Sequence, residues 1–187
     1  MKYEPFFRVL TEIIEGICRD HLNETRIFTE QRKGVPTLVV FPHAADYPKL
    51  IGRNGAQVNA FNFLVQRVSL RLDLRLALSI RESFIGEREP IDPFCYNPEF
   101  DLPAFEKLLT RLAAEVSEAP LAFTVTTADQ MVIARYPCER GDPNAALGSA
   151  LAAVLRPYCR DLGRSIYIKP QFLNQTHETD PELLRQR

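Results

Sequence analysis

The chain has 187 residues, long enough for one domain or for two small ones of roughly 80 to 100 residues each. Hydrophobic residues make up 45% and charged residues 25%, a composition typical of globular proteins that excludes a disordered chain or a fibrous repeat. The formal net charge of -1 gives no global sign of nucleic-acid binding, which usually accompanies a strongly basic composition.

The sequence carries no sign of a membrane span or a secretion signal. No apolar run approaches the roughly 20 residues that a membrane-spanning helix needs, and the opening MKYEPFFRVL lacks the layout of a signal peptide. We therefore expect a cytosolic protein without a membrane partner. Its widely spaced cysteines predict buried free thiols rather than disulfides or a metal site, and they are Cys18, Cys95, Cys138 and Cys159.

In the first half of the chain, hydrophobic periodicity predicts five elements. The first is an amphipathic helix, with Phe6, Leu10, Ile13, Ile14 and Ile17 on its apolar face. Two extended segments follow, beginning at Thr25 and Thr37, and the residues 32–34 between them indicate a hairpin turn. A second helix presents Val58, Phe61, Leu64, Val65 and Val68 on one face, and residues 75–80 alternate as a half-buried strand does.

Residues 84–101 contain three prolines and show neither helical nor strand periodicity, so they are the candidate linker. Beyond it the order of elements repeats, with a helix over 105–116, strands over 121–127 and 131–137, a helix over 147–155 and a strand over 165–169. A shift of 90 residues places the helix and strand that follow the loop in the first half on their counterparts in the second half, with Ile166 and Ile168 on Leu76 and Leu78. The sequence thus predicts an α+β protein with two similar units, 1–83 and 102–170, and a polar, loosely held tail over 171–187.

One short segment carries the chemistry that we single out. Gly52 and Gly55 enclose Arg53 and Asn54 where a short lead-in meets a longer helix. Glycines allow backbone conformations closed to other residues and let another chain approach closely, and a helix N-terminus favours a phosphate oxygen. Arg53 and the nearby Lys49 add positive charge. Residues 1–83 carry 12 Lys or Arg against 9 Asp or Glu, a balance of +3, so the basic share of the chain lies with this loop.

In this context the stretch DYPKLIGRNGAQVNAFNFLV resembles the KH family, whose hallmark is an I-G-x-x-G loop between two helices. The resemblance covers roughly residues 4–83 and is to the type II arrangement, α-β-β-α-α-β, of small bacterial KH proteins. It implies two tandem KH-like units of that order, each a small three-stranded sheet covered by helices, the second one degenerate.

The resemblance also implies that the loop clamps the backbone of single-stranded RNA, with the bases in a groove beside it. Gly52 and Gly55 would supply the close approach, and Arg53 and Asn54 would face the phosphates with Lys49 nearby. The apolar floor under the bases would be formed by Ile51 and Val58. No cofactor, metal or catalytic residue is implied.

The equivalent stretch of the second half lacks the features of the loop. It reads Asp142-Pro143-Asn144-Ala145, without either glycine, and Asp142 would repel phosphate. We expect this segment to pack against the first unit or to contact a protein rather than to bind RNA. Pro157, inside the helix that follows, predicts an early end or a kink there.

Several other residues allow two interpretations. Arg67, Arg71 and Arg75 recur at four-residue spacing and form either a basic track for RNA or a solvated helix face. Phe61 fits the core, whereas Phe63 is the better candidate for base stacking. The three histidines are dispersed without a metal-binding motif, and His43 with Asp46 indicates a polar turn rather than a catalytic dyad.

Two functions remain open from the sequence. The first is an RNA-binding protein with one active and one degenerate KH unit. The second is a protein-interaction or assembly factor that uses the same fold to contact the ribosome or another KH protein, which the near-neutral charge and the acidic second half favour. An enzyme of RNA metabolism would need a catalytic cluster that we do not find in the sequence, so we expect a protein that is not an enzyme.

Overall fold

A computed structural model describes residues 1–82, 100–139 and 142–172. In the first half the helices are α1 (Glu4–Ile17), α2 (Tyr47–Ile51) and α3 (Ala56–Leu72), with a 3-10 segment, η1 (Arg19–Glu24), after α1. The strands are β1 (Arg26–Arg32), β2 (Val35–Phe41) and β3 (Ala77–Ile80). Strand β2 lies in the middle of the sheet, antiparallel to β1 and parallel to β3.

The second half has a sheet with the same connectivity. Its elements are α4 (Leu102–Val116), β4 (Thr124–Ala128), β5 (Met131–Cys138), the 3-10 turn η3 (Pro143–Ala146), α5 (Leu147–Arg160) and β6 (Ser165–Phe172). Strand β5 is central, antiparallel to β4 and parallel to β6. The two halves therefore share an order of elements and a pattern of strand directions, except that η3 alone stands where the first half has α2.

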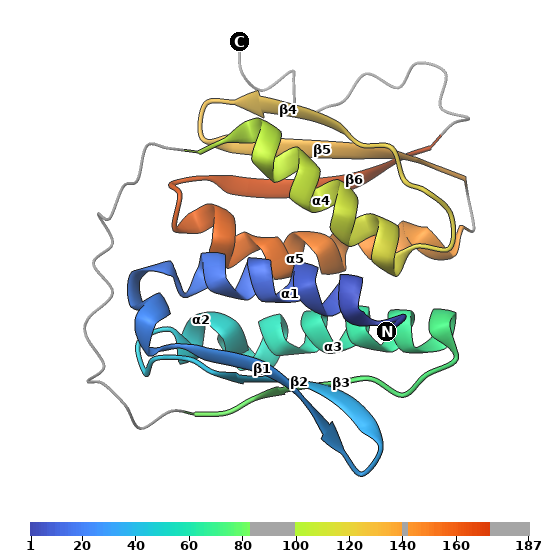
Figure 1. Ribbon diagram of the computed structural model, residues 1–187. Helices are drawn as coiled ribbons and strands as arrows, with labels where there is room; N and C mark the ends of the chain where they lie inside the picture. The colour runs from blue at the N-terminus through green and yellow to red at the C-terminus, as the bar shows by residue number, and fades with distance from the viewer. Residues whose placement is uncertain (83–99, 140–141, 173–187) are drawn as a thin grey trace.

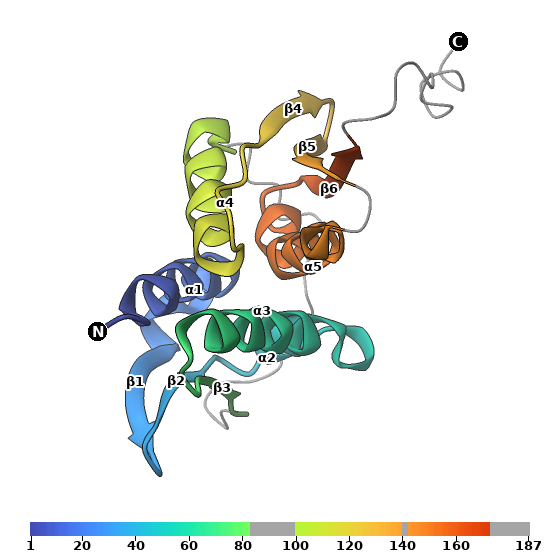
Figure 2. The same ribbon diagram turned by 90° about the vertical axis from the view of Figure 1, so that its right-hand side faces the viewer.

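The helices of both halves lie between the two sheets (Figures 1 and 2). One sheet, β1-β2-β3, forms one outer layer, and β4-β5-β6 forms the other. Between them α1 contacts α4 and α5, and α3 contacts the same two helices. The described parts of the two halves thus form one packed body.

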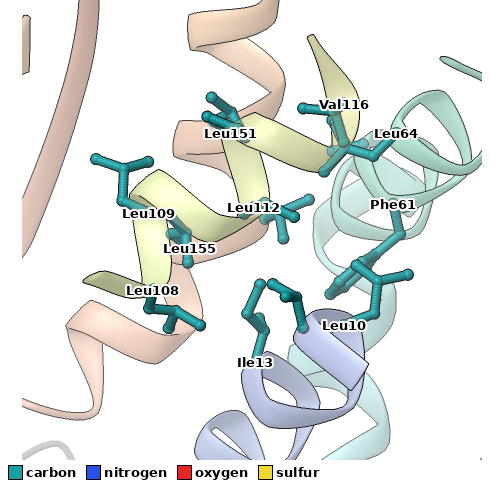
Figure 3. Packing of buried hydrophobic residues seen from close by; sticks show 14 of the residues in the cluster. Leu10, Ile13, Phe61, Leu64, Leu108, Leu109, Leu112, Val116, Leu151 and Leu155 are labelled. Atoms are coloured by element: carbon teal, nitrogen blue, oxygen red, sulfur yellow. The ribbon is translucent and has the colours of Figure 1, made fainter. Parts of the chain in front are cut away.

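The hydrophobic core is continuous across this boundary. Leu10 and Ile13 of α1 meet leucines of α4 and α5, and Phe61 and Leu64 of α3 approach the same cluster (Figure 3). All four residues are fully buried. Because burial of large apolar side chains is the main source of folding free energy, the halves stabilise each other.

Polar contacts also join the halves. The side chain of Gln57 on α3 donates from Nε2 to the carbonyl of Val154 on α5 at 3.0 Å, and both groups are buried. Helices α1 and α5 also approach closely. The ring of Tyr158 on α5 lies so near Gly16 of α1 that a Cβ at position 16 would stand 2.3 Å from the ring. Glycine at this position of α1 therefore allows α5 to pack closely.

Most of the predicted elements are present, with differences at their ends. The hairpin turn is confirmed, since Lys33 and Gly34 both have positive φ, as a two-residue turn requires. Strand β2 begins at Val35, two residues earlier than expected. The early end predicted at Pro157 is wrong, because α5 continues to Arg160 and the proline is buried among its neighbours. Burial offsets the one backbone hydrogen bond that proline removes.

Two predicted boundaries fall mostly on residues that the structure does not describe. The linker over 84–101 lies outside the described residues up to position 99, and α4 begins at Leu102 after its N-cap Asp101. The tail predicted over 171–187 begins inside a strand, because β6 continues to Phe172. The rest of that tail lies outside the described residues.

Candidate functional site

The loop between α2 and α3 takes a conformation that depends on its glycines. Gly52 has φ 75° and ψ 169°, Asn54 has φ 53° and Gly55 has φ 76°. Residues with a side chain rarely adopt such values, although Asn does so more readily than most. Three of the four loop residues thus have positive φ.

The two glycines are needed for different reasons. A Cβ on Gly52 would lie 2.6 Å from Cβ of Gln57 and 2.8 Å from its backbone nitrogen, so no side chain fits at position 52. A Cβ on Gly55 would meet only ordinary contacts, 3.7 Å or more away, so its requirement is the positive φ. Gly52 therefore permits close packing, whereas Gly55 permits the left-handed turn into α3.

The two middle residues of the loop are exposed, and α3 begins directly behind them. Arg53 and Asn54 are both solvent-exposed, and Gly55, the N-cap of the 17-residue helix α3, has no side chain to cap its first turn. The first backbone N–H groups of a helix have no partner within the helix and carry a partial positive charge. The exposed Arg53 and Asn54 therefore directly precede the N-terminus of a long helix.

A surface cavity of about 760 Å³ lies farther along α3. Its walls include Asn62, Gln66 and Leu70 of α3, Arg75 of the following turn, and Ala77 at the start of β3. Asn62 follows Gly55 by seven residues, which corresponds to roughly 10 Å along a helix axis. The loop and the cavity therefore lie on the same helix, about 10 Å apart.

The other predicted site residues are placed differently from one another. Ile51 and Val58 flank the loop and are half-buried, and neither belongs to the wall of the cavity. The side chain of Lys49, unlike that of the exposed Arg53, is only 8% exposed and lies among carboxylates. The positive charge of Lys49 is thus paired with carboxylates of the protein and does not add to the exposed charge of the loop.

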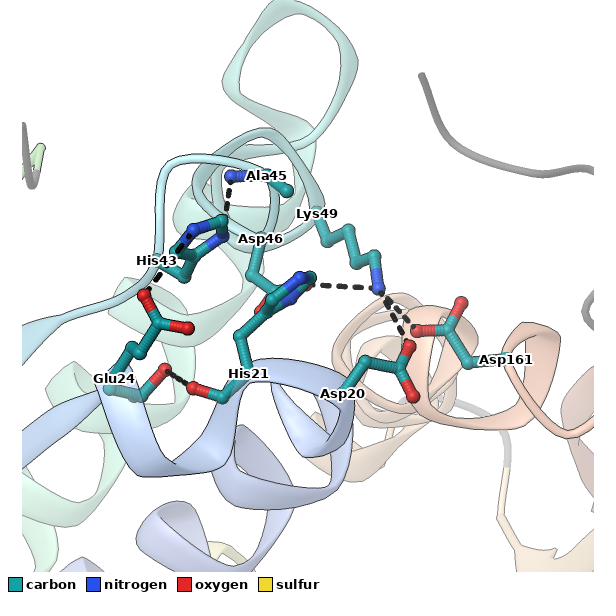
Figure 4. Close-up of polar contacts among 9 residues, drawn as sticks. Asp20, His21, Glu24, His43, Ala45, Asp46, Lys49 and Asp161 are labelled. Carbon is teal, nitrogen blue, oxygen red and sulfur yellow. Dashed lines mark hydrogen bonds and ion pairs between the residues drawn. The ribbon is translucent and has the colours of Figure 1, made fainter. Parts of the chain in front are cut away.

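Lys49 is the centre of a buried network that joins the two halves (Figure 4). Its Nζ lies 3.0 Å from Oδ1 of Asp46 and 3.0 Å from Oδ2 of Asp161, which follows α5, and 3.9 Å from Oδ2 of the exposed Asp20. Burial lowers the pKa of Lys49, but its hydrogen bonds to Asp161 and Asp46 outweigh this effect and raise the pKa above the ordinary value. Lys49 therefore ties the lead-in helix α2 to the second half.

Two histidines extend the network on the other side of Asp46. His21 Nδ1 lies 3.0 Å from Asp46 Oδ2, and the His21 and His43 rings stack with centroids 4.1 Å apart. His43 Nδ1 accepts from the backbone N–H of Ala45 at 3.3 Å (Figure 4). The polar turn expected at His43 is present, since the Asp46 N–H donates to the His43 carbonyl at 3.0 Å. The Asp46 carboxylate itself contacts His21, 25 residues earlier in the chain.

The second half uses the equivalent turn for internal contacts. Within 142–147 no residue has positive φ, and Asp142 Oδ1 accepts from the N–H of Asn144 at 2.7 Å. The Asn144 side chain is buried and accepts from Arg67 Nη2 at 3.0 Å. Tyr136 closes the turn from inside, since its hydroxyl donates to the Asn144 carbonyl at 2.8 Å and accepts from Gly148 N–H at 3.1 Å.

The arginines and phenylalanines that the sequence left open are now placed. Arg67 donates to the Val116 carbonyl at 3.2 Å as well as to Asn144, and Arg71 binds Glu115 at 3.0 Å. Both residues therefore contact the second half, Arg67 from a partly buried position and Arg71 from an exposed one, whereas Arg75 is exposed at the cavity. Phe61 is fully buried as predicted.

Phe63, the candidate for base stacking, is half-buried on α3 with the Arg67 guanidinium 6.0 Å from its ring centroid. The three described cysteines are buried free thiols, as expected, and Cys95 lies outside the described residues. Burial raises the pKa of Cys18 and of Cys159 to about 12, which leaves both thiols protonated at neutral pH.

Neither a metal site nor a membrane span is found in the part of the chain that the structure describes. Over residues 1–82, 100–139 and 142–172, no three His, Cys, Asp or Glu side chains are grouped to hold a metal ion. Among the helices of these segments, none combines the length and hydropathy needed to cross a bilayer.

No protein-family model matches the chain, and a search of curated proteins finds no match. Function is therefore inferred from the loop, its surroundings and the resemblance of its sequence. Sequence reasoning found the loop but missed the residues that hold it, namely Gln57, Asp161 and His21. A polar residue on the apolar side of a predicted helix, as Gln57 is, was the one available signal.

Proposed function

We propose that the protein binds single-stranded RNA by clamping its backbone at Gly52-Arg53-Asn54-Gly55. The observation that carries the proposal is the turn with positive φ at three of its four residues, in which Arg53 and Asn54 are exposed. It lies directly before the N-terminus of α3, which no side chain caps. A chain can approach this backbone closely, and its phosphate would meet helix N–H groups and the Arg53 guanidinium.

The cavity beside α3 supports a nucleic-acid ligand. A base that leaves the loop along α3 would reach side-chain amides at Asn62 and Gln66 and an exposed guanidinium at Arg75. Amides and guanidinium groups hydrogen-bond the edges of unpaired bases, and recognition of single-stranded RNA depends on such edges. Phosphate contacts at the loop and base contacts at the cavity would then divide affinity and selectivity between them.

The topology of the first half supports the KH resemblance of its sequence. The order α1-β1-β2-α2-α3-β3 is the type II order, and the loop lies between α2 and α3, where the resemblance predicts it. We assign residues 1–83 to a KH unit on this basis. The second unit has the same strand order without the glycine loop, and we propose that it is a degenerate KH unit.

The second unit would serve as a support for the loop rather than as a second RNA site. Gln57, against which Gly52 packs, is bound to α5, and Lys49 is bound to Asp161. The loop is thus held from both sides by contacts with the second half. A preorganised site loses less conformational entropy when its ligand binds.

The proposal is tested by fluorescence anisotropy with short single-stranded RNAs of mixed sequence. The variant Arg53→Asp, Asn54→Asp removes one positive and adds two negative charges at the phosphate site, and we expect it to lose at least about ten-fold in affinity. The affinity of the unchanged protein should fall steeply between about 50 and 200 mM salt, because binding releases counterions.

A matched control keeps the charge change but moves it to the second unit. Lys107→Asp, Thr110→Asp alters two exposed positions of α4 and changes the net charge by the same amount. This variant should bind RNA as the unchanged protein does, and circular dichroism should show both variants folded. Equal binding by the loop variant and the unchanged protein, or no binding by either, would reject the RNA-binding function.

A protein partner is the second candidate, favoured by one observation. Leu70 is 76% exposed and Leu74 is 39% exposed beside the cavity, and exposed leucines in a hollow are typical of protein contacts. The ribosome or another KH protein would be such a partner. Leu70→Ser should abolish a protein complex detected by sedimentation.

A further inference from the structure

The first sheet has one face that no described helix covers. Helices α1, α2 and α3 all lie on one side of β1-β2-β3 (Figures 1 and 2), where Leu38 and Val40 of β2 enter the core. Because side chains alternate along a strand, Val39 and Phe41 point to the opposite side, where Val39 is buried and Phe41 is half-buried. We call this side the open face. Its residues in β1 and β2, together with Arg81 after β3, include Arg26, Phe28, Glu30, Arg32, Val39, Phe41 and Arg81.

Two aromatic rings lie together on the open face. Phe28 of β1 pairs with Val39 and is 44% exposed, and its ring lies 6.2 Å from that of Phe41 at an angle of 18°. Single exposed apolar side chains are common on protein surfaces. Two near-parallel rings side by side are less common, and the exposed one, Phe28, offers a surface on which a nucleic-acid base can stack.

Positive charge surrounds these rings. The Arg81 guanidinium carbon lies 5.2 Å from the Phe41 ring centroid, and Arg26 pairs with Phe41 across the sheet. Glu30 contacts both Arg32 and, at 3.6 Å, Arg81 Nη2. Within the described strands and Arg81, the open face thus carries three guanidinium groups and one carboxylate, a balance of +2, on a chain whose net charge is -1.

The open face lies next to the cavity beside α3 that is proposed to hold RNA bases. Strand β3 forms the edge of the sheet, and its residues Ala77 and Leu78 line the cavity beside α3. Arg81 directly follows β3, and its backbone N–H donates to the Val40 carbonyl at 2.9 Å, which fixes the residue at the sheet edge. Adjacent strands are about 4.8 Å apart, so the aromatic pair lies roughly 10 Å from the cavity side of β3.

We propose that the open face is a second contact surface for single-stranded RNA, on which bases of the strand that leaves the cavity stack on Phe28 while the exposed Arg26 meets its phosphates. The inference rests on the RNA-binding function proposed for the loop and extends it from a few nucleotides to a longer strand. Charge favours RNA over a protein partner here, since a polyanion complements a surface of net positive charge.

The experiment compares two labelled RNAs, one of about five nucleotides that fills the loop and groove and one of about fourteen that also reaches the open face. Phe28→Ala in the full chain should weaken binding of the long RNA at least about five-fold, the loss expected for one base–aromatic stack, and leave the short RNA unaffected. Tyr167→Ala, which removes a similarly exposed aromatic residue from the second sheet, is the matched control and should change neither affinity.

Two further measurements distinguish stacking from other effects. Phe28→Leu keeps an apolar side chain without a ring and should bind the long RNA as weakly as Phe28→Ala. Arg26→Gln should reduce the salt dependence for the long RNA alone, because one phosphate contact is lost.

Unchanged affinity of Phe28→Ala for the long RNA would overturn the inference and leave a protein as the occupant of the open face. An equal loss for both RNAs, or full binding by Phe28→Leu, would overturn it as well, since neither fits stacking at a separate surface. In each of these cases binding to the loop stands. If the unchanged protein bound neither RNA, the proposed function and this inference would both fail.

Discussion

Removal of the buried ammonium group of Lys49 is the most direct test of how the two halves support each other. The variant Lys49→Met keeps the aliphatic stem and leaves Asp46, which is fully buried, and Asp161, which is 14% exposed, without their shared cation. Breaking a buried ion pair by removing one partner costs about 3 to 5 kcal/mol. We expect the lower end, about 3 kcal/mol, because Asp46 keeps its contact with His21.

Urea unfolding followed by circular dichroism measures this loss. With a urea dependence of about 2 kcal/mol per molar, the midpoint should fall by about 1.5 M. The control is Asp20→Asn, because Asp20 lies 3.9 Å from the same ammonium but is 59% exposed, and exposed pairs contribute less than about 1 kcal/mol. Adding Asp161→Asn to Lys49→Met should destabilise the protein less than the separate effects predict, since the two groups interact directly. A Lys49→Met midpoint no lower than that of Asp20→Asn would refute the idea that this network stabilises the fold.

The remaining predictions concern the interface, the core and pH. Gly148→Ala should lower the free energy of unfolding by about 2 kcal/mol or more, because its Cβ would lie 2.9 Å from a backbone oxygen of β6. Gly34→Ala, the control, meets no atom within 4 Å and should cost only about 1 kcal/mol of φ strain. Chemical denaturation compares the two variants. Arg67→Gln should cost about 1 to 3 kcal/mol in the same assay, because it loses hydrogen bonds to α4 and to the turn before α5. The free energy of unfolding should be constant from about pH 7 to 8 and fall above about pH 8.5. Burial raises the pKa of the Cys159 thiol to about 12 in the folded protein, whereas thiols of the unfolded chain have a pKa of about 8.5. Cys159 therefore ionises first in the unfolded chain, which favours unfolding as the pH rises. The raised pKa of Lys49 acts in the same direction at higher pH, since its contribution is present below about 10.4 and is lost as pH rises through the folded-state value. Urea midpoints at several pH values test this, and a Cys159→Ala variant should show a shallower fall.

The elements themselves could be predicted because their signals are local. The apolar stripes of α1 and α4 identify both helices, and every residue of the stripe from Phe105 to Val116 is buried as expected. Strand β1 begins at Arg26, one residue from the expected start, because the turn at Lys33 and Gly34 fixes where the hairpin reverses. Helix periodicity and turn chemistry involve neighbours in the chain, so the sequence contains them directly.

The loop could also be located, but not the role of each residue around it. Two glycines three residues apart, before an apolar stripe, are enough to predict a turn into a helix. The sequence does not reveal that Lys49 would face Asp161 rather than solvent, 112 residues away in the chain. Asp46 is a local partner, three residues before Lys49, but Asp161 reaches the ammonium group only because the end of α5 lies beside α2 in the folded chain.

The sequence by itself thus determined the order of helices and strands, the turn at Lys33 and Gly34, and the position of the glycine loop. The tertiary structure alone decided which polar groups meet, as with Gln57 and the carbonyl of Val154, and that the helices of the two halves share one core. The physical reason is the separation along the chain of the residues that interact. Backbone conformation responds to residues within a few positions, whereas ion pairs, buried hydrogen bonds and core contacts form between segments that become neighbours only when the chain folds.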